Sequence, residues 1–106
     1  MDSTKDLESM DQLKKLGSDM AKPHSPEFLL GFPTEAAAQA AAEKVRALQF
    51  EQVEVKPSAH GSDWFVHAEK TLLLTEEALR RLRYHFEKIA RAGGGYYDGW
   101  GAAVER

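Results

Sequence analysis

The sequence lacks cysteine and any long hydrophobic run, and its charges are nearly balanced. Without cysteine there is no disulfide framework, zinc–thiolate site or cysteine nucleophile, an absence that fits a cytoplasmic protein. No apolar run approaches the roughly 18 residues that span a bilayer, and the polar start Met1-Asp2-Ser3 is unlike a signal peptide. The formal net charge of −3 is too small to indicate a surface for nucleic acid or membrane.

Motifs for catalysis and for metal binding are also missing. The sequence has no nucleophile elbow, no P-loop and no carboxylate pair placed against a base, so we predict that the protein is not an enzyme and needs no cofactor. The glycines of residues 93–95 follow a predicted helix, whereas a phosphate loop precedes one. Four histidines lack ligand spacing and are predicted to be surface or sheet-face residues, not metal ligands: His24, His60, His67 and His85.

At 106 residues, with 42% hydrophobic and 29% charged residues, the chain fits one small ordered domain. We expect this domain to cover residues 23–106, after a segment, residues 1–22, that is helical or partly disordered. Apolar residues in that segment recur at helical steps. We expect a short helix whose apolar residues cover part of the open sheet face: Leu7, Met10, Leu13 and Leu16.

The rest of the chain alternates between strand and helix patterns. Strands are predicted at residues 28–32, 50–55, 64–68 and 96–104, and helices at 36–48 and 76–92, with Thr34 and Thr75 as N-caps. The order βαββαβ predicts an α+β, ferredoxin-like sandwich, in which a four-stranded antiparallel sheet carries both helices on one face. The predicted core consists of Trp64, Val66, Val53, Val55, Leu79, Leu82, Phe86 and Ile89.

Residues 96–101 combine three aromatic residues, two glycines and one acid. Asp98-Gly99 is a hairpin signal, but a hairpin would remove the fourth strand. We therefore predict an extended strand with a bulge or bend at Gly99, where Asp98 hydrogen-bonds to nearby backbone. One interpretation places Trp100 and one tyrosine in the core. The functional interpretation is a partner-binding edge formed by Tyr97, Asp98 and Trp100, together with Phe65, which alternation points away from the helices.

The last predicted helix carries several basic residues and supports an alternative function. Arg80, Arg81, Lys88 and Arg91 could contact phosphates and make the protein an RNA-binding module. A solvated helix face explains the same residues, Arg83 included, and is favoured because the bases gather toward the helix end. A third hypothesis is a ferredoxin-like dimer that senses a small ligand between its sheets.

Tyr97-Asp98-Gly99-Trp100-Gly101, at the end of a short βαββαβ chain, resembles the signature of the regulator of ribonuclease E activity B family. The order and length of the elements from about Leu7 to Val104 are similar as well. The resemblance implies a cytoplasmic bacterial protein that binds ribonuclease E and restrains RNA turnover without catalysis. Well-known members carry a strongly acidic C-terminal tail, which this sequence does not show before Arg106, so we expect weaker binding if that tail contributes.

Overall fold

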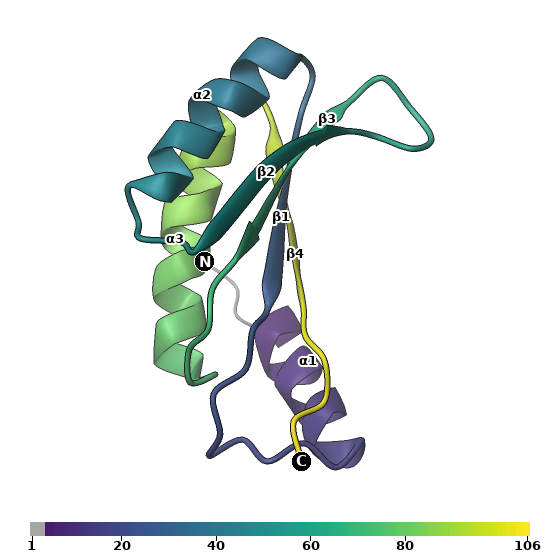
Figure 1. Cartoon of the computed structure of the whole chain (residues 1–106), viewed down its shortest axis with the longest axis vertical. Coiled ribbons are helices and arrows are strands. Elements are labelled where there is room, and N and C mark those ends of the chain that lie inside the picture. The colour runs from purple at the N-terminus through teal and green to yellow at the C-terminus, as the bar shows by residue number, and fades with distance from the viewer. Residues whose placement is uncertain (1–3) are drawn as a thin grey trace.

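The computed structural model describes residues 4–106 as three helices and a four-stranded antiparallel sheet (Figure 1). The strand order is β2-β3-β1-β4, so β1 and β3 are central, as in ferredoxin-like folds. This confirms the predicted fold class, including the N-terminal helix. The elements in chain order are α1 (Thr4–Lys15), β1 (Glu27–Phe32), α2 (Glu35–Arg46), β2 (Gln52–Pro57), β3 (Trp64–Glu69), α3 (Glu76–Ala92) and β4 (Tyr96–Gly101).

Both long helices begin at the predicted threonine caps. The hydroxyl groups of Thr34 and Thr75 each accept a hydrogen bond, at 3.1 Å, from the backbone N–H three residues later. Helix α2 ends at Arg46, two residues earlier than predicted, because the chain turns there and Gln49 adopts a left-handed φ of 64°. The last strand also ends early, at Gly101 instead of residue 104.

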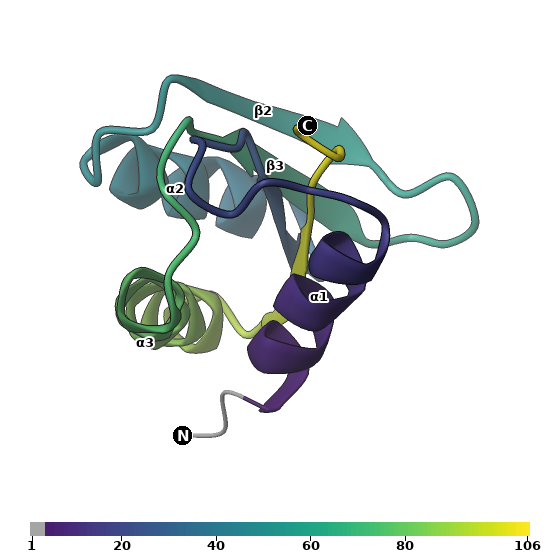
Figure 2. The same cartoon turned by 90° about the horizontal axis from the view of Figure 1, so that it is seen from below.

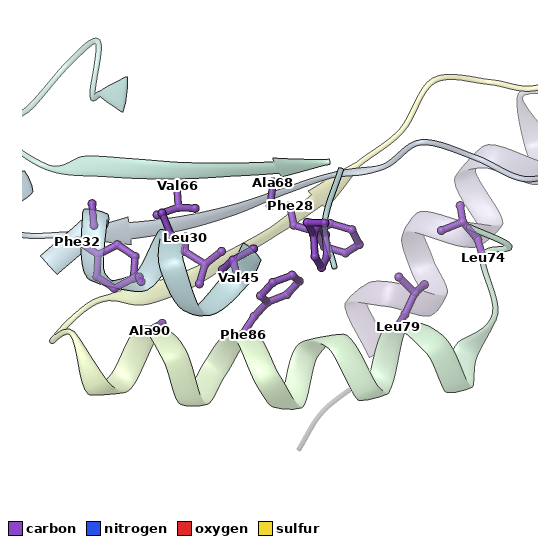
Figure 3. Packing of buried hydrophobic residues seen from close by; sticks show 14 of the residues in the cluster. Phe28, Leu30, Phe32, Val45, Val66, Ala68, Leu74, Leu79, Phe86 and Ala90 are labelled. Carbon is purple, nitrogen blue, oxygen red and sulfur yellow. The ribbon is translucent and has the colours of Figure 1, made fainter. Parts of the chain in front are cut away.

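The core lies between the sheet and helices α2 and α3, which cover one of its faces (Figures 2 and 3). Phe28 of β1 and Phe86 of α3 are fully buried, with ring centroids 5.1 Å apart. Val66, Leu79 and Phe86 confirm the predicted core. The other predicted members are only partly buried at its margin: Val53, Val55, Trp64, Leu82 and Ile89.

Helix α1 packs beside β4 and α3 and does not cover the open sheet face (Figure 2). Leu13 is buried and Met10 packs against the core, but Leu7 and Leu16 are 40% and 52% exposed. The prediction that these four side chains cover part of the open sheet face is therefore wrong. The reason is that α1 directs Asp6 and Leu13, two turns apart, toward β4 and α3.

His24 is fully buried, which contradicts the prediction of surface or sheet-face histidines at this position. Its backbone N–H and C=O pair with those of Leu72. The ring Nδ1 lies 2.9 Å from the carbonyl oxygen of Lys22, which can only accept, so Nδ1 carries the proton. Nε2 then accepts from the hydroxyl of Ser18 at 2.6 Å. Both ring nitrogens therefore have hydrogen-bond partners, which lowers the cost of burying the imidazole.

Candidate functional site

Strand β4 contains the bulge that the sequence predicts. Leu29 pairs with Gly99 and Leu30 pairs with Tyr97, so Asp98 is the extra residue on this strand. Gly99 has a φ of 91°, a left-handed conformation that side chains oppose. The expected hydrogen bond from the Asp98 side chain to nearby backbone is not found within residues 4–106. The carboxylate is exposed instead.

The bulge places Tyr97 and Trp100 on the same side of the sheet. Residues three positions apart on a regular strand point to opposite faces. Here Trp100 pairs with Phe28 and Tyr97 pairs with Leu30, and both partners face the helices. Tyr97 packs on the Phe86 ring with centroids 5.3 Å apart. Tyr97 and Trp100 are therefore half-buried on the helix side, whereas Asp98 is exposed.

Trp100 joins a group of side chains that we call the Asp6 cluster: Asp6, Arg83, Tyr97 and Trp100. The indole N–H donates to Asp6 Oδ1 at 3.0 Å. Arg83 donates to both carboxylate oxygens, at 2.8 Å from Nη2 and 3.1 Å from Nε. Asp6 is 2% exposed, so three donors satisfy an almost fully buried charge. The cluster ties α1, α3 and β4 together.

Within the Asp6 cluster, Arg83 stays charged and Tyr97 stays neutral. The hydrogen bonds with Asp6 raise the pKa of Arg83 above its ordinary value, and the Arg83 guanidinium lies 5.0 Å from the Tyr97 ring centroid. Burial raises the pKa of the Tyr97 phenol, which stays neutral at physiological pH. No group of this cluster is poised as a nucleophile or base. The arrangement holds the fold together.

The face of the sheet opposite the helices, called the open face below, carries aromatic and apolar side chains. Phe65 lies near Tyr96 in an edge-to-face arrangement with ring centroids 6.2 Å apart, and near His67 at 6.5 Å. The Tyr96 ring covers Gly31 so closely that a Cβ there would lie 2.5 Å from it. Phe65 therefore points away from the helices, as its alternation predicts.

Phe65 and Asp98 line one shallow hollow on the open face. Leu29 and Pro57 add apolar walls, and His67 and Lys56 add a polar edge. Tyr97 and Trp100 instead line a cleft beside α1, which Asp98 also borders. The four predicted partner-binding residues thus occupy two sides of β4. Phe65 and Asp98 come together, and Tyr97 and Trp100 come together in the Asp6 cluster.

The chain also matches a known protein family. A family model described as Regulator of ribonuclease activity B matches residues 4–102, nearly the whole chain. The chain belongs to this family. The match includes both α1, which supplies Asp6, and β4, which supplies Trp100. A search of curated proteins found no match.

Most basic side chains of α3 contact other side chains of the same helix in this family member. Arg80 pairs with Glu76, and Arg81 lies 3.5 Å from Glu77, each one helical turn away. Lys88 lies 5.2 Å from the Tyr84 ring centroid. Exposed i,i+4 pairs of this kind are typical of a solvated helix. They leave Arg91 as the one member of the predicted RNA-binding set with no partner in residues 4–106.

The described part of the chain offers neither a metal-binding cluster nor a membrane-spanning helix. In residues 4–106, no three His, Asp or Glu side chains gather where they could hold a metal ion. None of the helices in that same range is long and apolar enough to cross a membrane.

Sequence reasoning missed the central role of Asp6 and treated Arg83 as part of the basic surface. A signal for Arg83 existed, because it follows Leu79 by four residues and precedes Phe86 by three, on the apolar face of α3. A cation at that position needs a buried partner. Nothing local points to Asp6, which lies 77 residues earlier.

Proposed function

We propose that this protein binds ribonuclease E and lowers its rate of RNA cleavage, without catalysing a reaction itself. Membership of the Regulator of ribonuclease activity B family supports the regulatory role. The specific endonuclease follows from the resemblance of residues 97–101 to the family signature. The observation that carries the proposal is this family match over residues 4–102. The same resemblance, together with the absence of cysteine, supports a cytoplasmic location in a bacterium.

We place the contact surface on the open face. Phe65 and Asp98 both line the hollow there, and none of the residues that line it belongs to a helix. An apolar and aromatic surface left without an intramolecular partner is a common feature of protein-binding sites. Tyr97 and Trp100 contribute to the same site through the bulge that presents Asp98. Inhibition follows either from occlusion of the endonuclease or from a change in its assembly.

Titration calorimetry with purified ribonuclease E tests the proposal. The expected result is a saturable complex, with RNA cleavage falling to a plateau as the complex fills. RNA incubated with this protein alone should stay intact. Phe65→Ser should weaken binding about tenfold, which is the loss expected for a central interface aromatic. Leu7→Ser changes another exposed hydrophobic residue, on α1, and should bind as the wild type does. Absence of binding by the wild type would refute the proposed function.

Trp100 needs a test that separates contact from folding. Trp100→Phe keeps a ring but removes the N–H that donates to Asp6. Its affinity for ribonuclease E should be compared with wild type at matched folded fraction. Equal affinity would remove Trp100 from the contact surface and leave it a structural residue of the Asp6 cluster.

A further inference from the structure

We infer that the open face binds an arginine-bearing segment of the partner protein, with a guanidinium group held between Asp98 and the Phe65 ring. This inference rests on the proposed function for the partner's identity, and it specifies the chemistry of the binding segment. Three features of the face lead to it: its charge, its unpaired carboxylates and its hollow.

Acidic side chains outnumber basic ones on the open face. Lys56 is the one lysine or arginine that the four described strands direct there, and it lies 3.0 Å from Glu54. This contact lowers the pKa of Glu54 and raises that of Lys56. Glu27 lies 3.4 Å from His67. By strand alternation Glu69 also faces this side, so the face is acidic overall.

Two carboxylates on this face are unpaired. Within residues 4–106, the carboxylate of neither Asp98 nor Glu69 has a hydrogen bond or an ion pair. This differs from Asp6, which has three donors. An exposed carboxylate without a partner costs little in the free protein, yet it strengthens binding when a cation arrives in a partly desolvated site.

The hollow at Asp98 has a lining that suits a guanidinium group. Its volume is about 370 Å³, and Leu29, Pro57 and Phe65 give it apolar walls. Lys56 also lines it, but its ammonium group lies 3.0 Å from the carboxylate of Glu54, which balances its charge. Arginine combines a planar face that stacks on aromatic rings with donors that match a carboxylate. A lysine ammonium offers only a point charge, which favours arginine at this position. A phosphate backbone would be repelled by the same carboxylates, so the occupant is a protein segment and not RNA.

A peptide titration of the full chain tests the chemistry directly. The probe is the hexapeptide Ac-Arg-Ala-Arg-Ala-Arg-Ala-NH2, followed by amide chemical shifts of the ¹⁵N-labelled protein. The expected shifts gather at Leu29, Phe65, His67 and Asp98. An analogue with citrulline, which keeps the side-chain shape and removes the charge, should bind at least about fivefold more weakly. Equal binding of the two peptides, or shifts confined to other surfaces, would overturn the inference.

Matched variants identify the carboxylate. Asp98→Asn should weaken the arginine peptide about tenfold, as expected for loss of one charge-assisted contact. Asp11→Asn makes the same change at an exposed position on α1 and should leave affinity unchanged. Phe65→Leu keeps the apolar wall but removes the ring, and it should weaken binding about threefold. Wild-type affinity for Asp98→Asn would refute the proposed site.

Parallel titrations with ribonuclease E distinguish the two proposals. If the arginine peptide binds the open face but the endonuclease does not bind, the proposed function fails and the chemistry of the face stands. If the endonuclease binds with equal strength to wild type and Asp98→Asn, and the peptide causes no shifts, the inference fails and the proposed function stands. Binding of a single-stranded RNA oligonucleotide at Phe65 would also overturn the inference.

Discussion

Phe28 and Phe65 lie on neighbouring strands of one sheet, yet their surroundings differ completely. Phe28 faces the helices, is fully buried and packs against Phe86, whereas Phe65 faces the open side in contact with Tyr96. The aspartates on the two sides of the sheet differ as well. The carboxylate of Asp6 accepts three hydrogen bonds, whereas that of Asp98 accepts none from residues 4–106. The side chains on the covered side contribute to stability, and those on the open face are the ones that we propose for partner binding.

The largest expected effect comes from truncating the two phenylalanines. Phe28→Ala should lower the free energy of unfolding by about 3–5 kcal/mol, because it leaves a cavity in a closely packed core. Phe65→Ala should lower it by about 1 kcal/mol or less. Urea denaturation followed by circular dichroism measures both. Equal losses would show that the two faces do not differ in the way described.

The aspartates provide the next comparison. Asp6→Ala should cost about 3 kcal/mol, because it removes the buried carboxylate that accepts two hydrogen bonds from Arg83. Within residues 4–106, the guanidinium then keeps only Glu87, at 3.3 Å, as an ion-pair partner. Asp98→Asn should change the stability by less than about 0.5 kcal/mol. Hydrogen exchange should show residues 4–15 exchanging much faster in Asp6→Ala than in the wild type. Unchanged protection of α1 would contradict the role given to the Asp6 cluster.

A substitution in the bulge should have a smaller effect on stability, through the backbone conformation alone. Gly99→Ala should cost about 1–2 kcal/mol, because Gly99 has a φ of 91° while a Cβ there would meet no atom within 4 Å. Gly101→Ala is a matched control on the same strand. Its Cβ also meets nothing within 4 Å, and its φ lies outside the left-handed region, so no loss is expected. Similar losses at both positions in thermal unfolding would contradict the bulge.

The smallest effect concerns alkaline pH. Because burial raises the pKa of Tyr97 in the folded state, its phenol stays neutral where the unfolded chain begins to ionise, near pH 10. The stabilisation is complete below that pH and is lost as the pH rises toward the folded-state pKa. Tyr97→Phe should therefore lose less stability than wild type between pH 9 and about 11 in urea titrations. Identical losses would contradict the burial of this phenol.

Features set by local sequence were predictable. Thr34 and Thr75 correctly predict where helices α2 and α3 begin, and Gly99 predicts the bulge in β4. Strand alternation places Phe65 on the open face. These signals work because caps, left-handed turns and strand periodicity depend on neighbouring residues only.

Features that depend on distant pairs were not predictable. Asp6 contacts Trp100 across 94 residues and Arg83 across 77, and both contacts hold α1 against the rest of the fold. His24 is buried because a linker returns to Leu72, which no local pattern indicates. Phe65 could be placed on the correct face from strand alternation. The interpretation with Trp100 and one tyrosine in the core agrees with their packing against it, but their contacts with the distant Asp6 and Arg83 could not be predicted.

The number of residues between Tyr97 and Trp100 therefore has a consequence at the opposite end of the chain. On a regular strand, residues 97 and 100 would point to opposite faces. The extra residue at position 98 shifts the alternation by one, so both aromatic rings point to the same face. Deleting a single residue there would turn the indole toward solvent and take a donor from Asp6. The first helix would then be held to the rest of the fold by one hydrogen bond fewer, although every one of its own residues would remain.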